Sequence, residues 1–319
     1  MIKKIGILTS GGDAPGMNAT LIGAIRTGIN LGKEMYVVYD GYKGLVDGNF
    51  VRVDKNFAID KLATGGTVIK TARLPEFKEE KVREKAVKDL KAAGIDALIV
   101  IGGDGSYVGA KKLTEMGINC IGLPGTIDND ISSTDYTIGF DTALNTVVKA
   151  IDEIGDTMSS HHRCGVVEIM GNNCPDLTTF AGIATNADFI ITKDNLIDKE
   201  ELFKELRAKK EANQDHVMVL VAEKLLDTDA LTKEIEANTG WVARLSVLGH
   251  IQRGGVPSAM ERYNSIRMGS YAVQLLNEGI GGVCVGIVKN ELKYSEIEEA
   301  LKLERNKHMD LYKFHDLLK

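Results

Sequence analysis

Two short apolar runs are each followed by a glycine-rich loop and then by a helical pattern, and this repeat constrains the fold more than any other feature of the chain. The first run, residues 5–8, precedes a loop over 9–18, and the second run, residues 97–101, precedes a loop over 102–106. A continuous apolar run of this length is typical of a strand covered on both faces. Both loops are therefore expected at one carboxyl edge of a parallel sheet, where such sheets bind their ligands.

Glycines in these loops let the backbone approach a phosphate closely, and the free amides at the start of a helix present partial positive charge to it. The carboxylate of Asp104, in the second loop, is suited to hold Mg²⁺ beside phosphate oxygens. A tight turn without a ligand is the alternative for the first loop taken singly. The chain has no P-loop pattern, and Val108 stands where a dinucleotide-binding loop would have its third glycine.

Composition excludes several classes of protein. The 319 residues suffice for two domains of ordinary size, and 44% of them are hydrophobic. A formal charge of -6 offers no bulk attraction to nucleic acid or to an anionic membrane surface, so neither partner is expected. No run approaches the ~20 apolar residues that span a bilayer. Four scattered cysteines predict a reducing, cytoplasmic setting.

A zinc site near His161 and His162 is not favoured, although Cys164 and Cys174 follow them closely. The segment lacks a Cys-x-x-Cys pair, and adjacent histidines rarely share one metal face.

The segment 124–130, Pro-Gly-Thr-Ile-Asp-Asn-Asp, places two carboxylates two residues apart directly after the strand-like run 119–123. Residues two apart in an extended loop tend to face the same side, so Asp128 and Asp130 address one small space with the Thr126 hydroxyl. One carboxylate of such a pair can act as a general base while the other supports it or holds a metal. The alternative is an ordinary Asp-Asn-Asp turn.

The second half of the chain also alternates strands and helices. Strand-like runs occur at residues 165–170, 189–191, 217–222 and 243–248, with helical patterns such as 202–212 between them. The run 285–288 is expected to return the chain to the first sheet. The charged segment from Glu291 to the end is interpreted as helical packing with a solvated face.

Five motifs together resemble the bacterial ATP-dependent 6-phosphofructokinases, and the resemblance runs nearly end to end. They are Thr-Ser-Gly-Gly-Asp with Pro-Gly-Met-Asn at 9–18, Ile-Gly-Gly-Asp-Gly-Ser at 101–106, the segment 124–130, Gly-Phe-Asp-Thr-Ala at 139–143, and Leu-Gly-His-Ile-Gln-Arg-Gly-Gly at 248–255. The resemblance implies an α/β fold of two Rossmann-like three-layer α/β/α domains with a cleft between them. It implies an ATP-binding domain over 1–139 plus 252–306, a sugar-phosphate domain over 140–251, and a C-terminal tail over 307–319.

The resemblance implies ATP and fructose 6-phosphate as substrates and Mg²⁺ as the cofactor, held at Asp104. Asp128 matches the base that takes the proton of the sugar's carbon-1 hydroxyl, with Thr126 and Asp130 supporting it. The implied ATP-binding residues are Gly12, Arg73, Leu74, Gly103, Asp104, Gly105 and Ser106, of which Arg73 also matches a catalytic position. The implied sugar-phosphate residues are Thr126, Ile127, Asp128, Arg163, Met170, Gly171, Asn172, Glu223, Arg244, His250, Ile251, Gln252 and Arg253.

Arg163 and Arg244 match positions that reach a neighbouring subunit in the family, so the resemblance implies a homotetramer with shared active sites. Pyrophosphate-dependent relatives carry Asp at the position of Gly105 and Lys at that of Gly125. Two glycines favour ATP, because an Asp side chain would crowd and repel the α-phosphate.

The chain departs from the family pattern at Asn172, which stands where bacterial members usually have an arginine. A neutral amide cannot replace that charge, so a slower enzyme is expected, and Asn172→Arg is expected to raise kcat.

A second departure concerns the regulatory site that binds ADP or phosphoenolpyruvate in the family. The matching positions are Ile22, Arg26, Gly155, Asp188, Ala212, Gln214 and His216. Four phosphate-binding cations are missing there, so weakened allosteric control is expected, although Arg207, Lys209 and Lys210 are candidates to compensate.

Two alternatives remain for the function. One is a low-activity regulatory paralogue that pairs with an active subunit, and the other is a kinase of a related sugar phosphate, such as tagatose 6-phosphate or sedoheptulose 7-phosphate. A NAD kinase is disfavoured because the motif from His250 to Arg253 has no counterpart there.

Overall fold

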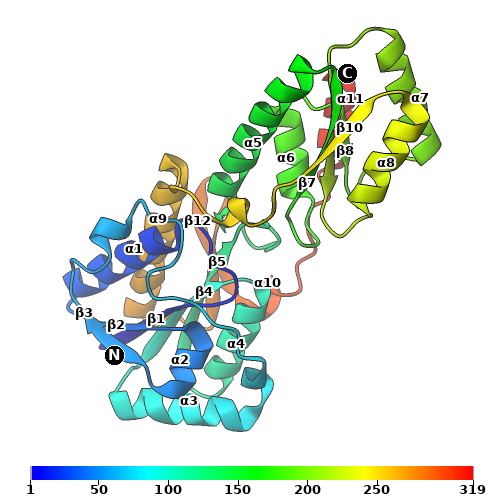
Figure 1. Cartoon of the computed structure of the whole chain (residues 1–319). Coiled ribbons are helices and arrows are strands. Elements are labelled where there is room, and N and C mark those ends of the chain that lie inside the picture. The colour runs from blue at the N-terminus through cyan, green and yellow to red at the C-terminus, as the bar shows by residue number, and fades with distance from the viewer. Residues whose placement is uncertain (1, 319) are drawn as a thin grey trace. The chain divides into compact units, whose positions relative to one another are not determined.

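The computed structural model describes residues 2–318, which divide into two compact units. Unit 1 extends to Thr142 and resumes over Arg253–Arg305, whereas unit 2 comprises Ala143–Gln252 and the residues from Asn306 onward. Each unit has a largely parallel β-sheet with α-helices packed on it (Figure 1). The predicted α/β class is thereby confirmed.

The sheet of unit 1 is parallel in its centre and antiparallel at its two edges, in the order β12-β11-β5-β4-β1-β2-β3, with β6 paired to β5. Its strands are β1 (Lys4–Thr9), β2 (Glu34–Val38), β3 (Phe50–Val53), β4 (Ala97–Gly102), β5 (Asn119–Thr126), β6 (Ile138–Gly139), β11 (Val283–Val288) and β12 (Glu291–Glu296). The two apolar runs of the repeat are β1 and β4, which pair in parallel as neighbours. Their following loops therefore share one edge of the sheet, as predicted.

Helices cover both faces of this sheet. The faces carry α1 (Met17–Asn30) with α9 (Ala259–Asn277) on one side, and α2 (Gly41–Asp47), α3 (Glu80–Ala93), α4 (Asp104–Glu115) and α10 (Ile297–Ala300) on the other, with short 3₁₀ turns η1 (Ile59–Lys61) and η2 (Pro75–Lys78) in the connections. Helices α1 and α9 approach closely, since a Cβ on Gly269 would lie 2.2 Å from the Thr20 carbonyl oxygen. Only glycine permits this contact.

Unit 2 has a fully parallel four-stranded sheet in the order β10-β7-β9-β8. Its elements are β7 (Arg163–Ile169), β8 (Phe189–Ile191), β9 (Val217–Ala222), β10 (Val242–Val247), α6 (Asp176–Ala184), α7 (Lys199–Glu211), α8 (Thr228–Thr239) and α11 (Met309–Leu318), together with α5 (Phe140–Ser160) and η3 (Gly249–Arg253), which each span a unit boundary. Trp241 is buried under α7 and α8 and donates its indole N–H to the Leu206 carbonyl at 2.8 Å.

The C-terminal helix α11 packs against α6 within unit 2. Its Tyr312 hydroxyl lies 2.8 Å from the Thr179 hydroxyl and 2.7 Å from the Thr192 hydroxyl, all three buried. These contacts fix the end of the chain on this unit. Among residues 2–318, no helix has the length and apolar character that crossing a bilayer requires.

Two expectations about local structure were wrong. Residues 291–296 were expected to be helical but form β12, which pairs antiparallel with β11. The strand expected to end before Pro124 continues to Thr126, because β4 pairs with it as far as Pro124 and β6 pairs with Gly125 and Thr126. Pro124 costs one ladder hydrogen bond without ending the strand.

One buried carboxyl group anchors α9 in unit 1. Glu261, with 3% of its surface exposed, accepts hydrogen bonds from the Thr142 amide at 3.3 Å and from the Ser265 hydroxyl at 3.4 Å. Burial raises the pKa of this carboxyl group from 4.5 to about 7, although hydrogen bonds to the Gly139 and Thr142 amides oppose the shift.

We expect Glu261 to make unit 1 less stable as pH rises between about 4.5 and 7. In that window the folded state keeps a proton that the unfolded state has released, so the contribution is complete below pH 4.5 and is lost through pH 7. The full shift corresponds to about 3 kcal/mol. Urea unfolding of the wild type and of Glu261→Gln across this window measures the difference between them.

The exposed carboxyl at the other end of α9 supplies a control, since Glu278→Gln changes charge without burial. A difference in unfolding free energy between wild type and Glu261→Gln that stays constant from pH 4.5 to 7.5 would contradict the assignment.

Candidate functional site

Three strand ends meet at one edge of the unit 1 sheet. The parallel register aligns Thr9 of β1 with Ile101 of β4, and Ile101 with Leu123 of β5. The Ser10 amide donates to the Ile101 carbonyl at 2.8 Å, which joins the first glycine loop to the second strand. The predicted nucleotide loops and the segment with the paired carboxylates are therefore brought together.

The first glycine loop is fixed by the segment that carries Arg73 and Leu74. The Thr71 hydroxyl donates to the Gly11 carbonyl at 2.9 Å. The Thr9 hydroxyl lies 3.0 Å from the Thr67 hydroxyl, and both of these side chains are buried. Arg73 is two residues after Thr71 and its side chain is exposed. The bond of Thr71 to Gly11 therefore holds the backbone near Arg73 against the first glycine loop.

The second loop forms the N-terminus of α4 and leaves room beside it. Gly103 is the N-cap and Asp104 begins the helix, while a Cβ added at Gly103 or Gly105 would meet no atom within 4 Å. Ser106 is buried beside the first loop, with its hydroxyl 3.8 Å from the position of a Gly11 Cβ. Helix N–H groups with open space before them suit an anion such as a phosphate.

The Asp104 carboxylate is suited to coordinate a magnesium ion that also binds a phosphate group. Partial burial raises the pKa of its carboxyl group. Residues 2–318 contain no group of three His, Cys, Asp or Glu side chains arranged to hold a metal ion. A single carboxylate agrees with the usual manner of Mg²⁺ binding, in which water and substrate phosphate oxygens supply most ligands.

The segment after β5 holds Asp128 in a defined turn. The Asp128 amide donates to the Thr126 hydroxyl at 3.1 Å, and the Thr137 hydroxyl donates to the Thr126 carbonyl at 2.7 Å. Asn129 adopts a left-handed conformation with a φ of 54°, and its side-chain oxygen accepts from the Thr137 amide at 2.9 Å. Asp128 is 8% exposed and Ile127 is fully buried, whereas Asp130 is partly exposed.

The predicted sugar-phosphate residue Arg253 lies in unit 1 beside the predicted ATP-binding residue Gly12. The Arg253 guanidinium packs over Gly12, where an added Cβ would be 2.3 Å from Nη1, and it donates to the Asp13 carbonyl at 3.4 Å. Any side chain at position 12 would displace this arginine. A substitution at Gly12 would therefore change the position of the Arg253 guanidinium over the first glycine loop.

In unit 2, predicted sugar-phosphate residues meet at the carboxyl ends of β7 and β9. The Glu223 Oε1 atom accepts from the Gly171 amide at 3.2 Å and from the Asn172 amide at 2.8 Å. The Met170 amide donates to the side-chain oxygen of buried Gln252 at 3.1 Å. These bonds fix the loop after β7, while His250 and Ile251 are exposed nearby in sequence.

This loop lines a small pocket of about 50 Å³. The lining residues are Asn172, Asn173, Cys174, Pro175, Lys193, Ala222, Glu223, Lys224 and Leu225. Lys193 and Lys224 were missed in the sequence, because single lysines in turns are most often surface residues. The position of Lys224 directly after Glu223 was the available signal.

Two other predicted residues do not join this pocket within unit 2. Arg163 lies at the start of β7, and the loop at Met170 follows the other end of this strand. A strand rises about 3.3 Å per residue, so Arg163 lies roughly 20 Å from that loop. Arg244 lies level with Gly165 in the sheet register and contacts Glu236 at 3.7 Å.

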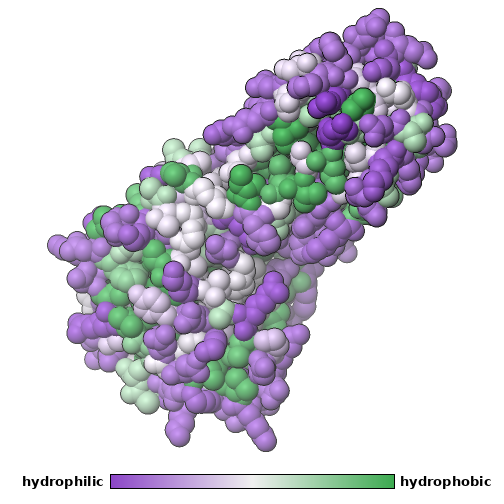
Figure 2. Space-filling view, in the orientation of Figure 1, coloured by the Kyte–Doolittle hydropathy of each residue, from purple (hydrophilic) through white to green (hydrophobic). Residues whose placement is uncertain are grey.

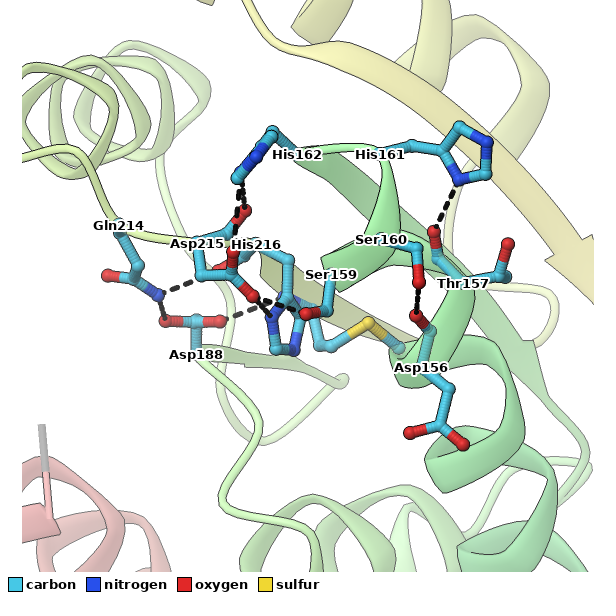
Figure 3. A network of polar contacts seen from close by, with 11 residues as sticks. Asp156, Thr157, Ser159, Ser160, His161, His162, Asp188, Gln214, Asp215 and His216 are labelled. Atoms are coloured by element: carbon cyan, nitrogen blue, oxygen red, sulfur yellow. Dashed lines mark hydrogen bonds and ion pairs between the residues drawn. The ribbon is translucent and has the colours of Figure 1, made fainter.

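The predicted regulatory positions of unit 2 form a polar network (Figure 3). The Gln214 amide group donates to Asp188 at 2.7 Å and to the His216 carbonyl at 2.9 Å, while Asp188 also accepts from the Met218 amide at 2.8 Å. A Cβ on Gly155 would lie 3.9 Å from the His216 ring. Ala212, the C-cap of α7, has no charged side chain and therefore supplies no cation.

The remaining regulatory positions belong to α1 in unit 1. Ile22 is buried, and Arg26 donates to the Lys55 carbonyl at 3.2 Å.

The candidate compensating cations each have a partner within unit 2, and for Lys209 that partner is the predicted regulatory residue Asp188. Lys209 pairs with Asp188 at 2.9 Å, Lys210 lies over the Trp241 ring at 4.5 Å, and Arg207 donates to the Asn238 carbonyl at 3.0 Å.

Comparison with known proteins agrees with this arrangement. The phosphofructokinase family model matches residues 4–276. The chain is 55% identical over 314 residues to the ATP-dependent 6-phosphofructokinase of Vibrio vulnificus (strain YJ016) and 52% identical over 314 residues to that of Vibrio cholerae, covering 98% of this chain and 98% of each relative.

A solved phosphofructokinase structure from Saccharomyces cerevisiae superposes with a TM-score of 0.91 at 32% identity, covering 98% of this chain and 50% of that chain. The chain thus spans half the length of the yeast chain. A pyrophosphate-dependent phosphofructokinase from Marinobacter aquaeolei shares the fold at a TM-score of 0.84 and 18% identity, covering 99% of this chain and 91% of that chain. With a family match over most of its length, the chain belongs to the phosphofructokinase family.

Proposed function

We propose that the chain transfers the γ-phosphoryl group of ATP to the carbon-1 hydroxyl of fructose 6-phosphate. One observation carries the proposal: the parallel register of β1, β4 and β5 brings both glycine-rich loops and the Asp128 turn to one edge of the sheet. The Vibrio relatives, which match this chain along 98% of their length, are named for this activity.

In the proposed reaction Asp128 accepts the proton of the carbon-1 hydroxyl as that oxygen attacks the γ-phosphorus. The amide-to-hydroxyl bond of Asp128 with Thr126 holds the base in place, and its low exposure limits competition from water. Amides at the start of α4 would bind the nucleotide phosphates, with Asp104 holding Mg²⁺, which neutralises charge on the transferring group. Arg73 is the proposed cation of the phosphate-binding loop.

The glycines at the site support ATP over pyrophosphate. Space beside Gly105 is open, so an Asp side chain there would occupy a region that a nucleotide phosphate can use. At Gly125 an added Cβ would meet Met17 Cε at 2.9 Å and the Gly102 amide nitrogen at 3.1 Å, so a lysine requires the packing to shift.

We expect Asp128→Asn to lower kcat by roughly 10²- to 10⁴-fold, the usual contribution of a general base. The amide keeps the size of the carboxylate but cannot accept the proton. A coupled assay with ATP or pyrophosphate, across fructose 6-phosphate, tagatose 6-phosphate and sedoheptulose 7-phosphate, measures turnover and substrate choice together.

Asp60→Asn is the matched control, since Asp60 is an exposed carboxylate of unit 1 paired with Lys61. Retention of wild-type kcat by Asp128→Asn would remove Asp128 from the base role. Wild-type protein that binds the sugar phosphate without turnover would favour the regulatory-paralogue alternative.

We further propose that ADP and phosphoenolpyruvate regulate this enzyme weakly. The network of Asp188, Gln214 and His216 is satisfied internally, and the nearby cations are engaged with other groups. An anionic effector would have to break these contacts, at a cost that reduces its affinity.

Millimolar phosphoenolpyruvate or ADP is accordingly expected to change the fructose 6-phosphate concentration at half-saturation by less than twofold. Steady-state kinetics with a sodium chloride control of equal ionic strength separates binding from screening. A large shift in the half-saturating concentration, or a new sigmoidal dependence, would show that the regulatory site is intact.

A homotetramer with shared active sites is also proposed. Arg163 and Arg244 do not join the pocket of their own unit, and β10 is a sheet edge whose Val242 and Val247 are exposed by 40% and 57%. Figure 2 shows hydrophobic residues gathered on the visible face of unit 2. An exposed edge strand with apolar side chains is a surface that another chain commonly covers.

Co-expression of Asp128→Asn and Arg244→Ala subunits is expected to restore activity that neither variant has alone. A hybrid assembly contains sites in which both residues are intact if the arginine serves a neighbour. The measurement is specific activity of doubly tagged hybrids, with light scattering for the mass. Hybrids no more active than their parents would contradict shared sites.

The thiols support a reducing, cytoplasmic setting as part of the proposal. All four cysteines are buried and carry thiols. Burial raises the pKa of the Cys120 and Cys164 thiols to about 12, so they stay protonated and inert toward oxidation.

A further inference from the structure

The pocket of unit 2 contains a cation that neither the sequence patterns nor the comparisons assign. Lys224 lies in the turn after β9, next to Glu223, and lines the pocket with Asn172. Its ammonium group donates to the Asn172 side-chain oxygen at 2.9 Å. Asn172, which stands where the family usually has an arginine, is therefore in direct contact with a positively charged group.

The charge of Lys224 is not neutralised within the described part of the chain. Among residues 2–318 it forms no ion pair, and its one hydrogen bond goes to a neutral amide. An ammonium group has three N–H donors, so two donors and the full charge remain for a ligand. Lys233 differs from Lys224, because the charge of its ammonium group is paired with the Asp229 carboxylate at 2.5 Å.

The backbone holds both residues in uncommon conformations. Asn172 has a φ of 54° and Lys224 a φ of 62°, in the left-handed region that costs a non-glycine residue free energy. The Glu223 carboxylate stabilises this geometry by accepting the Gly171 and Asn172 amides. The carboxylate is thereby engaged with backbone, which leaves Lys224 to contact an anion in the pocket.

The pocket suits a small polar anion. Its cavity of about 50 Å³ is small, as the site of a single anionic group would be. It lies at the carboxyl ends of the adjacent strands β7, β9 and β8, where parallel sheets bind ligands.

We propose that Lys224 binds an anionic oxygen of the phosphorylated sugar and supplies the positive charge that Asn172 lacks. This inference rests on the proposed function and adds a substrate-binding residue to it. Asn172 orients the ammonium group through its side-chain oxygen, and so acts as a positioning residue. The loss of the arginine is compensated by a lysine on the neighbouring strand end.

Lys193 lines the same pocket but differs in its support. Its side chain is exposed and no hydrogen bond to Asn172 orients it. Lys193→Met is therefore expected to raise the KM for fructose 6-phosphate by a smaller factor than Lys224→Met.

The test compares Lys224→Met, Lys224→Arg, and Lys224→Met combined with Asn172→Arg. Methionine matches the length of the lysine stem and its backbone preferences, so the change isolates the charge. A hydrogen bond to a charged group contributes about 1.5–3 kcal/mol, so Lys224→Met is expected to raise the KM for fructose 6-phosphate roughly 10- to 100-fold. The KM for ATP is expected to stay within twofold, and Lys224→Arg to retain most of the affinity.

Moving the charge gives a readout that a purely structural role would not produce. Asn172→Arg is expected to restore fructose 6-phosphate affinity in the Lys224→Met background and to gain little in the wild type, where Lys224 already supplies the charge. The two substitutions are thus expected to be strongly non-additive.

Lys233→Met is the matched control, because it removes a lysine charge from the same unit outside the pocket. Calorimetric binding of fructose 6-phosphate without ATP provides a readout independent of turnover, and thermal unfolding reports whether each variant is folded. A Lys224→Met effect equal to that of Lys233→Met, or no rescue by Asn172→Arg, overturns the inference.

The inference and the proposed function fail in different ways. Absence of ATP-dependent turnover in the wild type rejects the proposed function, while the calorimetric comparison still tests Lys224 as a sugar-phosphate ligand. A wild type that is active, together with a Lys224→Met variant of unchanged KM and affinity, rejects only the inference.

Discussion

The parallel register of β1, β4 and β5 is the constraint on which the rest of unit 1 depends. It places Thr9, Ile101 and Leu123 at one level, so that each following loop begins at the same edge. Close packing of the loops then restricts their composition. A Cβ on Gly102 would lie 2.5 Å from the Ser10 carbonyl oxygen, so glycine at this position is required by the sheet itself, before any ligand is considered.

Much of this architecture could be predicted because buried parallel strands have a local signature. The apolar runs of β1 and β4 are continuous, and each ends at glycines that begin a helix. Strand β12 has no such signature: its sequence, Glu-Leu-Lys-Tyr-Ser-Glu, is charged and largely exposed. Its conformation comes from pairing with β11, which no local pattern contains.

The candidate site shows a similar division. Glycine loops and paired carboxylates predicted phosphate chemistry from residue types, whereas the residue-by-residue assignment required the resemblance to a family. Neither source predicted Lys224, because its position depends on the turn after β9 meeting the loop after β7. A tertiary contact between residues 52 apart in sequence leaves no trace in the periodicity of either segment.

The cations of unit 2 differ in how fully the fold neutralises them. Lys209, at the predicted regulatory region, is mostly buried and pairs with Asp188. An anionic ligand that took Lys209 from this pair would leave the partly buried Asp188 carboxylate without its cation, which costs free energy. Among residues 2–318, the Lys224 ammonium group hydrogen-bonds only to the neutral Asn172 amide. It is exposed, so a ligand anion displaces water and leaves no carboxylate unpaired. On these proposals, the fold disfavours an anion at the Asp188 end of unit 2 and favours one at the Lys224 end. The difference follows from which lysine has an acidic partner.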